Sequence, residues 1–255
     1  MTGADGVLGA RVLRLLADRD VRAIDLRRGH RLLEPATYAL AVAGCDAVVH
    51  AAALHPLVAD PGTTAAEYRA ANVAPFEVLV DRLRAEGVSR LVLVSSTSVW
   101  RDAAEQAPAR FIDERTPADA DLGYAASKRE CEELATASGL DVVTLRLARF
   151  ARRGDPEDNV RLLYRAVDPD DAAAAVVRAL DHAVAGALYA ISGPTPFRPE
   201  DAVGLMEDPR AVIRTRTGHD PEWVPQRIAS VIVAERALHE LGWRPAHPSP
   251  LVLHR

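Results

Sequence analysis

The chain has 255 residues, of which 49% are hydrophobic and 26% charged, and a formal net charge of −5 at pH 7. This length and apolar content predict a single domain with a substantial core. A mildly acidic chain without a basic cluster argues against nucleic acid or an anionic membrane as a partner. Cys45 and Cys131 lack metal-like spacing, which predicts reduced thiols and no metal site. With no apolar run near ~18–20 residues and no charged-then-apolar leader, we expect a cytoplasmic protein.

The first nine residues read MTGADGVLG and are followed by an apolar periodic stretch that predicts a helix from Val7 to Leu16. Glycines at Gly3, Gly6 and Gly9 would allow a tight turn, close approach of the backbone to a pyrophosphate, and close packing of the helix. The pattern therefore favours a dinucleotide-binding turn, although an ordinary glycine turn has the same composition.

Val21 to Asp25 is predicted to be the next strand, and Asp25 lies 16 residues after Gly9. A dinucleotide fold places the carboxylate that accepts the adenosine ribose hydroxyls near this position, so Asp25 favours NAD. Arg27 and Arg28 follow directly and could instead hold a 2′-phosphate, which leaves NADP possible. The segment from Gly29 to Pro35 is too short for a third strand with its loops.

The remaining elements alternate between strand and helix. The sequence predicts strands at 46–53, 90–98, 141–147, 164–167 and 188–192, helices at 35–43, 65–86, 124–137, 170–182 and 230–241, and a loop at 101–122. This alternation indicates an α/β fold with a Rossmann-like, doubly wound parallel sheet and helices on both faces.

Two predicted strands end in residues suited to ligand binding, because ligands of open α/β sheets bind at the carboxyl ends of the strands. The small residues Ala51, Ala52 and Ala53 would let a flat cofactor lie close. The strand at 90–98 changes from apolar to hydroxyl side chains at Ser95. His50, a lone histidine at a strand end, is interpreted as structural rather than as a ligand.

Lys128 is the only lysine among 31 basic residues, and it lies four positions after Tyr124. On a helix, this spacing places both side chains on one face, roughly 5–6 Å apart at Cβ. A compact ammonium beside a phenol stabilises the phenolate and lowers the phenol pKa from ~10 toward the operating pH of a catalytic acid or base. The alternative is an exposed helix on which the tyrosine packs against the lysine stem.

The glycine turn, the strand that ends at Ser96 and the Tyr124-x-x-x-Lys128 pair occur in this order, and the chain therefore resembles the short-chain dehydrogenase/reductase superfamily. The spacing of its glycines is similar to that of the extended branch, the NAD-dependent epimerase/dehydratase family. Further echoes of the family pattern are HAAA at 50–53, Asn72-Val73, Ser127-Lys128-x-x-x-Glu132, Leu145-Arg146 and Leu241-Gly242-Trp243.

The resemblance implies a catalytic group of Ser96, Tyr124 and Lys128. Tyr124 would exchange the proton of a substrate hydroxyl or carbonyl, Lys128 would lower the tyrosine pKa and bind the nicotinamide ribose, and Ser96 would hydrogen-bond the same substrate oxygen. Thr97 is the alternative for the hydroxyl role. The cofactor, NAD with NADP as the alternative, would be bound by Gly3, Asp5, Gly6, Leu8, Gly9, Asp25, Ala51, Ala52, Ala53, Asn72, Tyr124 and Lys128.

The expected reaction is hydride transfer at a secondary alcohol or ketone of a small, sugar-like molecule. A small substrate-binding region, built from about 149–169 and 192–255 within the single domain 1–255, favours a compact substrate. Arg161 falls where compact uronate dehydrogenases have a substrate-facing arginine, and a guanidinium fork suits a carboxylate; it could equally be a surface charge. A redox-neutral epimerase or dehydratase, and a non-catalytic dinucleotide-binding regulator, are the alternatives.

The resemblance also implies a homodimer through the helices that carry Asn72 and Tyr124. The family's first strand is central, yet Met1 leaves about one residue of it. We therefore expect a strand of typically ~5–6 residues upstream of Met1. The alternative is that the sheet closes around the gap.

Overall fold

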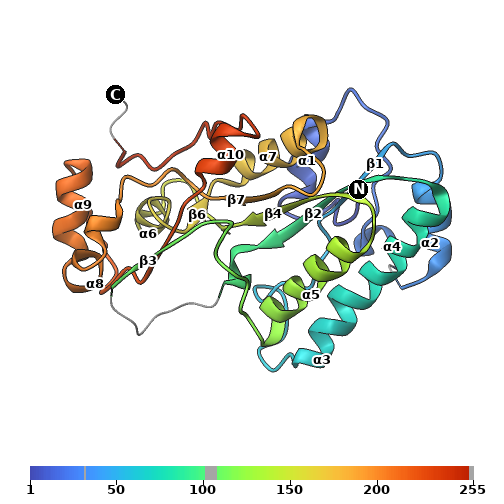
Figure 1. Ribbon diagram of the computed structural model, residues 1–255, viewed down its shortest axis with the longest axis horizontal. Coiled ribbons are helices and arrows are strands. Elements are labelled where there is room, and N and C mark those ends of the chain that lie inside the picture. Colours follow the sequence, from blue (N-terminus) through green and yellow to red (C-terminus); the bar gives the residue numbers. More distant parts are fainter. Residues whose placement is uncertain (32, 101–107, 253–255) are drawn as a thin grey trace.

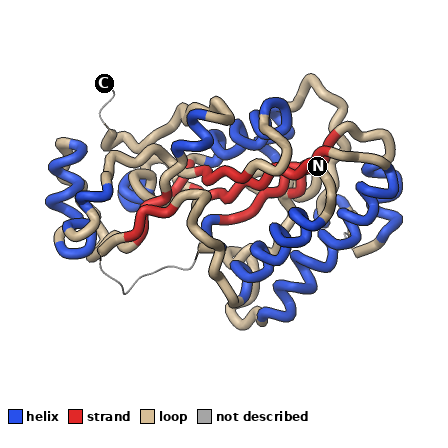
Figure 2. The backbone as a smooth tube through the Cα atoms, in the orientation of Figure 1, coloured by secondary structure: helices blue, strands red, loops and turns tan. Residues whose placement is uncertain are grey.

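The computed structural model describes the chain except for residues 32, 101–107 and 253–255, and at its centre lies a parallel sheet (Figures 1 and 2). Its four strands run in the order β1 (Ala47–His50), β2 (Arg90–Ser96), β4 (Asp141–Leu147) and β7 (Leu188–Ile191). Apolar runs in these strands are buried on both sides, as a covered parallel sheet requires. The predicted α/β fold is confirmed.

A single residue extends this sheet beyond β1. Thr2 forms parallel bridges to His50 on one side and to Ile24 on the other. Its N–H donates to the Val49 carbonyl at 2.9 Å, and its carbonyl accepts from Ala51 at 3.3 Å. The predicted strand at 21–25 is wrong, since only Ile24 bridges. A strand needs a partner of comparable length, and here that partner is one residue long.

A hollow of about 490 Å³ lies next to Thr2. It is bounded by Val21, Arg22 and Ile24 on one side and by 46–49 on the other, with Leu16 and Leu79 among the apolar residues that line it. The hollow lies between the segment that ends at Ile24 and β1, on the side of Thr2 away from the glycine turn. The upstream strand expected from the sequence stays a prediction.

Helices cover both faces of the sheet (Figure 1). One face carries α1 (Gly9–Leu15), α7 (Pro169–His182) and α10 (Glu235–His239), whose apolar residues share a core with Val49, Val92 and Val143. The other face carries α2 (Pro35–Val42), α4 (Ala74–Glu86) and α5 (Gly123–Ala137), packed on Val48, Leu91 and Val142. Among the described residues, no helix combines the length and apolar character needed to cross a membrane.

The helix predicted at 65–86 is interrupted. It consists of α3 (Ala65–Tyr68), a π-helical turn (Arg69–Val73) and α4. Pro75, at the start of α4, has no N–H for the regular helical hydrogen bond, which accounts for the change in the preceding turn. Asn72 lies in this wider turn and is buried.

The helix predicted at 230–241 is also wrong in its first half. Residues Ser230–Ile232 form β8, which pairs in parallel with β3 (Arg110–Ile112) from the predicted loop. The three residues of β8 are buried and β-branched at two positions, so they fit a covered strand better than a helix. Helix α10 begins only at Glu235.

A second, smaller region extends from one end of the sheet (Figure 1). Residues such as Val160, Phe197, Leu205, Ile213 and Val231 form its separate apolar core. Its elements are β3, β5 (Arg149–Phe150), α6 (Pro156–Arg161), β6 (Ala166–Val167), α8 (Gly204–Glu207), α9 (Pro209–Thr217) and β8. The predicted small substrate-binding region includes most of these residues, and its role stays a prediction.

Gly9→Ala should destabilise the fold. A Cβ at Gly9 would lie 2.0 Å from the Gly3 carbonyl oxygen, against backbone that cannot move aside cheaply. We expect a loss of about 1–3 kcal/mol or more in the free energy of unfolding. Gly62→Ala is the control, because a Cβ there meets nothing within 4 Å and the backbone is not left-handed. Equal urea midpoints for the two variants would contradict the tight-turn interpretation.

Stability should depend on the protonation of His50. Burial, reinforced by the charge of Lys128, lowers the pKa of His50 from 6.5 to about 3. Its contribution to stability is therefore complete above pH 6.5 and is lost as the pH falls toward 3, with a slope of up to ~1.4 kcal/mol per pH unit. Urea unfolding across this range should give a smaller slope for His50→Gln. The exposed His239→Gln variant should keep the wild-type slope; the same slope in all three proteins would refute the assignment.

Candidate active site

The glycine turn lies against the end of β1. Gly3 has a φ of +69°, and a Cβ there would lie 2.7 Å from the Ala51 carbonyl carbon. Only glycine allows this conformation and this approach without strain. The turn is further tied to the strand end by the Ala52 N–H, which donates to the Thr2 hydroxyl at 3.3 Å. The turn and the small residues at 51–53 thus form one continuous surface at the carboxyl edge of the sheet.

Asp25 lies at the far end of this surface. One carboxylate oxygen accepts the backbone N–H of Asp5 at 3.0 Å, and the other accepts that of Arg27 at 2.9 Å. The carboxylate thereby caps a short 3-10 turn at 26–28 and fixes the glycine turn relative to Ile24. The side chain of Leu8 is buried in the core beneath the turn, and its role toward a cofactor stays a prediction.

Ser96 and Tyr124 meet at the other end of the edge. Ser96 is the last residue of β2, and Tyr124 is in the first turn of α5. Burial raises the pKa of the Tyr124 phenol, and its hydrogen bond with Ser96 opposes this rise. Burial therefore acts against the lowered phenol pKa that the sequence analysis expected from Lys128. Ser96 also accepts from the N–H of Ser98 at 3.1 Å.

Lys128 lies one turn after Tyr124 and is 2% exposed. Burial lowers the pKa of its ammonium, while Cys131 and Glu132 act in the opposite direction. The positive charge also lowers the pKa values of His50 and His55, after the larger effect of burial. The alternative of an exposed helix with a tyrosine resting on a lysine stem is wrong, because Lys128 belongs to the interior.

Two aromatic side chains flank the Tyr124 phenol. The sequence analysis assigned neither of them to the site. The His55 ring lies 5.0 Å from the Tyr124 ring in an edge geometry, and the Tyr68 ring lies 6.1 Å away. The His55 Nδ1 accepts the N–H of Leu57 at 3.2 Å, which orients the imidazole. In the sequence, only the position of His55 shortly after the end of β1 could have indicated that it lies beside Tyr124, since no spacing motif links the two residues.

Buried polar contacts fix the position of α5. Asn72 accepts the Leu54 N–H at 2.7 Å and donates to the Ser127 hydroxyl at 2.9 Å, joining the loop after β1 to the helix. One turn after Lys128, Glu132 accepts from the Ser95 hydroxyl and from Arg146, whose Nη2 lies at 2.7 Å. Buried pairs of this kind require defined geometry, so α5 is held to both β2 and β4.

The two residues predicted to contact the substrate lie in different surroundings. Thr97 begins the 3-10 turn that follows Ser96 and is partly buried. Arg161, at the end of α6, donates to Asp158 at 3.0 Å and to Glu157 at 2.5 Å, and its guanidinium lies over the Trp223 ring at 4.8 Å. Its fork is therefore engaged within its own region, and its role toward a substrate stays a prediction.

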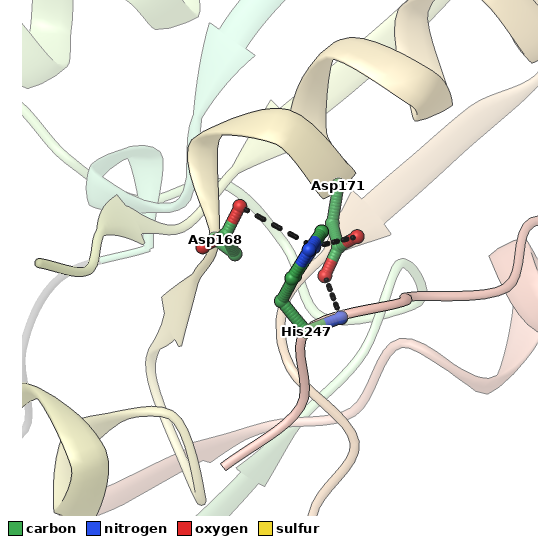
Figure 3. Close-up of side chains that lie close together, drawn as sticks. All are labelled: Asp168, Asp171 and His247. Atoms are coloured by element: carbon green, nitrogen blue, oxygen red, sulfur yellow. Dashed lines mark hydrogen bonds and ion pairs between the residues drawn. The ribbon is translucent and has the colours of Figure 1, made fainter. Parts of the chain in front are cut away.

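A cluster of Asp168, Asp171 and His247 has ligand atoms within 4.8 Å of one another (Figure 3). Asp168 caps α7 and binds Arg153 at 2.6 Å. Asp171 accepts the backbone N–H groups of Ala246 and His247 at 2.8 and 2.9 Å. These contacts attach the C-terminal segment to the start of α7, and we interpret the cluster as structural.

The edge as a whole fits a dinucleotide. The glycine turn has backbone without side chains at Gly3, Gly6 and Gly9. Asp25 lies at one end of this edge, which we call the cofactor edge, and Tyr124 and Lys128 lie at the other. The parts of a cofactor that these residues would contact stay a prediction. All of these residues lie at the carboxyl ends of parallel strands or in the segments that follow them, where α/β sheets bind such ligands. Asn72 supports this edge through Leu54 and Ser127.

Comparison with solved structures finds the same fold. A short-chain dehydrogenase/reductase superfamily protein from Agrobacterium tumefaciens with bound NAD has a TM-score of 0.72 and 21% identity, over 97% of this chain and 92% of that one. UDP-N-acetylglucosamine 4-epimerase from Bacillus cereus has a TM-score of 0.67 and 20% identity, over 98% and 94%. The dTDP-glucose 4,6-dehydratase DesIV from Streptomyces venezuelae, as a double mutant with NAD bound, has a TM-score of 0.66 and 23% identity, over 97% and 91%.

A search of curated proteins gave no match. The model of the NAD-dependent epimerase/dehydratase family matches residues 1–167, about two thirds of the chain, including the glycine turn, Ser96, Tyr124 and Lys128. This match covers all of the cofactor edge and shows an NAD(P)-dependent enzyme. The chain belongs to the NAD-dependent epimerase/dehydratase family.

Proposed function

We propose that this enzyme carries out net hydride transfer between NAD and a secondary alcohol or ketone of a small, sugar-like molecule. The observation that carries the proposal is the hydrogen-bonded pair of Ser96 and Tyr124, with Lys128 buried one turn away, at the nicotinamide end of the cofactor edge. When bound there, the nicotinamide accepts or returns the hydride. Homodimer formation through α4 and α5 remains part of the proposal.

Each catalytic residue has a separate task in this proposal. The Tyr124 phenol, kept protonated by its surroundings, gives its proton to the oxygen of a ketone as the hydride arrives, and takes it back in the direction of oxidation. The Ser96 hydroxyl, held at the end of β2, positions the same oxygen. The Lys128 ammonium places a compact charge beneath the phenol, which favours the deprotonated form when the alcohol is oxidised.

The end of β2 offers no strong acid or base directly after Ser96. Removal of water from a sugar carbon requires a further proton donor or acceptor besides the phenol. The residues that follow Ser96 at the end of β2 are Thr97 and Ser98, whose hydroxyl groups are poor acids and bases near neutral pH. A dehydratase would need to take this group from another part of the chain, whereas an epimerase needs no such group. A redox-neutral epimerase or dehydratase is therefore the second candidate, and the similarities to a 4-epimerase and to a 4,6-dehydratase support it.

Tyr124→Phe should lower kcat by at least about 100-fold, because general acid–base catalysis contributes 10²- to 10⁴-fold. Lys128→Arg should do the same, since a broad guanidinium cannot replace a compact ammonium inside the protein. Tyr38→Phe is the matched control, because Tyr38 is a fully buried tyrosine on α2, outside the cofactor edge. Thermal unfolding of each variant separates loss of chemistry from loss of fold. Retention of most activity by Tyr124→Phe would refute the proton-transfer assignment.

A panel of sugars, sugar acids, short secondary alcohols and nucleotide sugars would distinguish the two candidate reactions. For net hydride transfer we expect a sustained change in the absorbance of the reduced nicotinamide, in proportion to product. An epimerase would give product by chromatography without a lasting absorbance change. Product formed without such a change would overturn net redox chemistry while leaving the site assignment in place.

A further inference from the structure

Asp5, within the glycine turn, is held by the guanidinium of Arg28. Arg28 Nε donates to both carboxylate oxygens, at 3.1 and 2.9 Å, and Nη2 donates to Oδ1 at 2.7 Å. The pKa of Asp5 is lowered, first by this hydrogen bond, and that of Arg28 is raised by the same contact. The Asp5 carboxylate thus occupies the Nε and Nη2 donors of Arg28, which could otherwise bind another anion through two hydrogen bonds.

The surrounding contacts hold this pair in place. Arg27 Nη1 donates to the Asp5 carbonyl at 2.5 Å, and the Asp5 N–H donates to Asp25 at 3.0 Å. An exposed ion pair alone restrains its side chains weakly, but here the backbone of the carboxylate residue is fixed from two sides. Two arginines and two aspartates therefore balance one another at the adenosine end of the cofactor edge.

We propose that Asp5 is a specificity-determining residue that excludes NADP by sequestering Arg28. This inference rests on the proposed binding of the cofactor along this edge. A 2′-phosphate adds roughly two negative charges and requires an available guanidinium. In this chain, Arg28 is already bound to Asp5, and the carboxylates of Asp5 and Asp25 would repel the phosphate. NAD has hydroxyls at this position, for which a carboxylate is a suitable acceptor. Arg28 is thus a potential phosphate ligand that Asp5 keeps engaged.

The test is Asp5→Asn, which removes the charge and keeps the shape and the backbone N–H. Isothermal titration of the purified enzyme with NAD and with NADP gives the ratio of their dissociation constants without any need for turnover. We expect Asp5→Asn to shift this ratio toward NADP by about tenfold, because one guanidinium fork is released and one negative charge is removed. In Asp5→Asn/Arg28→Gln, the gain in NADP affinity should disappear.

Asp181→Asn is the matched control. Arg19 and Asp181 form an equally bidentate pair, at 2.8 and 2.9 Å. The exposed side-chain fractions in that pair, 45% and 28%, equal those of Arg28 and Asp5. Because Asp181 lies on α7, away from the glycine turn, its variant should leave the ratio of dissociation constants unchanged.

Arg28→Gln alone provides a second, independent measurement. If Arg28 is sequestered, its loss should change NADP affinity by less than about twofold, since it makes no contact with the phosphate in the wild type. An unchanged ratio in Asp5→Asn, or a tenfold loss of NADP affinity in Arg28→Gln, would overturn the inference while NAD binding still supports the proposed function. Failure of the wild type to bind either dinucleotide would instead refute the proposed function and this inference with it.

Discussion

The glycine turn is joined to the central sheet chiefly through Thr2. Thr2 pairs with His50 through its backbone and hydroxyl and with Ile24 on its other side. The glycine turn, Asp25 and the end of β1 all take their positions from these bridges. The bonds that hold the turn are the backbone hydrogen bonds of Thr2 to Val49 and Ala51 and the buried contact between the Thr2 hydroxyl and the His50 ring.

The opposite end of the edge is fixed by side chains rather than by backbone ladders. Helix α5 carries Tyr124 and Lys128, and its position depends on buried polar pairs made by Ser127 and Glu132 to neighbouring elements. Such contacts are costly to bury unless fully formed, so they hold the helix in one position. The phenol then meets Ser96 because α5 is fastened to the strand that ends in this serine.

Electrostatics in this arginine-rich chain are largely a matter of local pairing. Arg146, Arg153 and Arg161 each engage an acidic residue that is itself buried, and the pKa of one of these acids, Asp158, is lowered to about 2. Lys128 differs from these arginines, because its charge is a compact ammonium and lies buried in the interior. The arginines form local ion pairs, while the buried lysine lies one turn after the tyrosine to which we assign proton transfer.

The sequence alone predicted the α/β class, the four central strands, the glycine turn and the Tyr124–Lys128 pair. Each of these depends on local periodicity or on spacing along one element. Two other segments, one near each end of the chain, were assigned wrongly from the sequence. Ser230–Ile232 reads as part of a helix until its parallel partner at 110–112 is known, and 21–25 reads as a strand although only Ile24 has a partner. Pairing between distant segments decides such cases, and local pattern does not encode it.

The candidate site divides in the same way. Sequence spacing singled out the residues that we propose to act on a proton and the acid that we propose for the adenosine end. Only the tertiary structure showed that His55 lies at the edge of the Tyr124 ring, that burial raises the pKa of the phenol, and that Arg28 binds Asp5. These outcomes depend on burial and on which charged side chains meet across more than twenty residues of chain. A sequence specifies which groups are present, but solvent exclusion and long-range contact determine which of them remain free to bind a ligand.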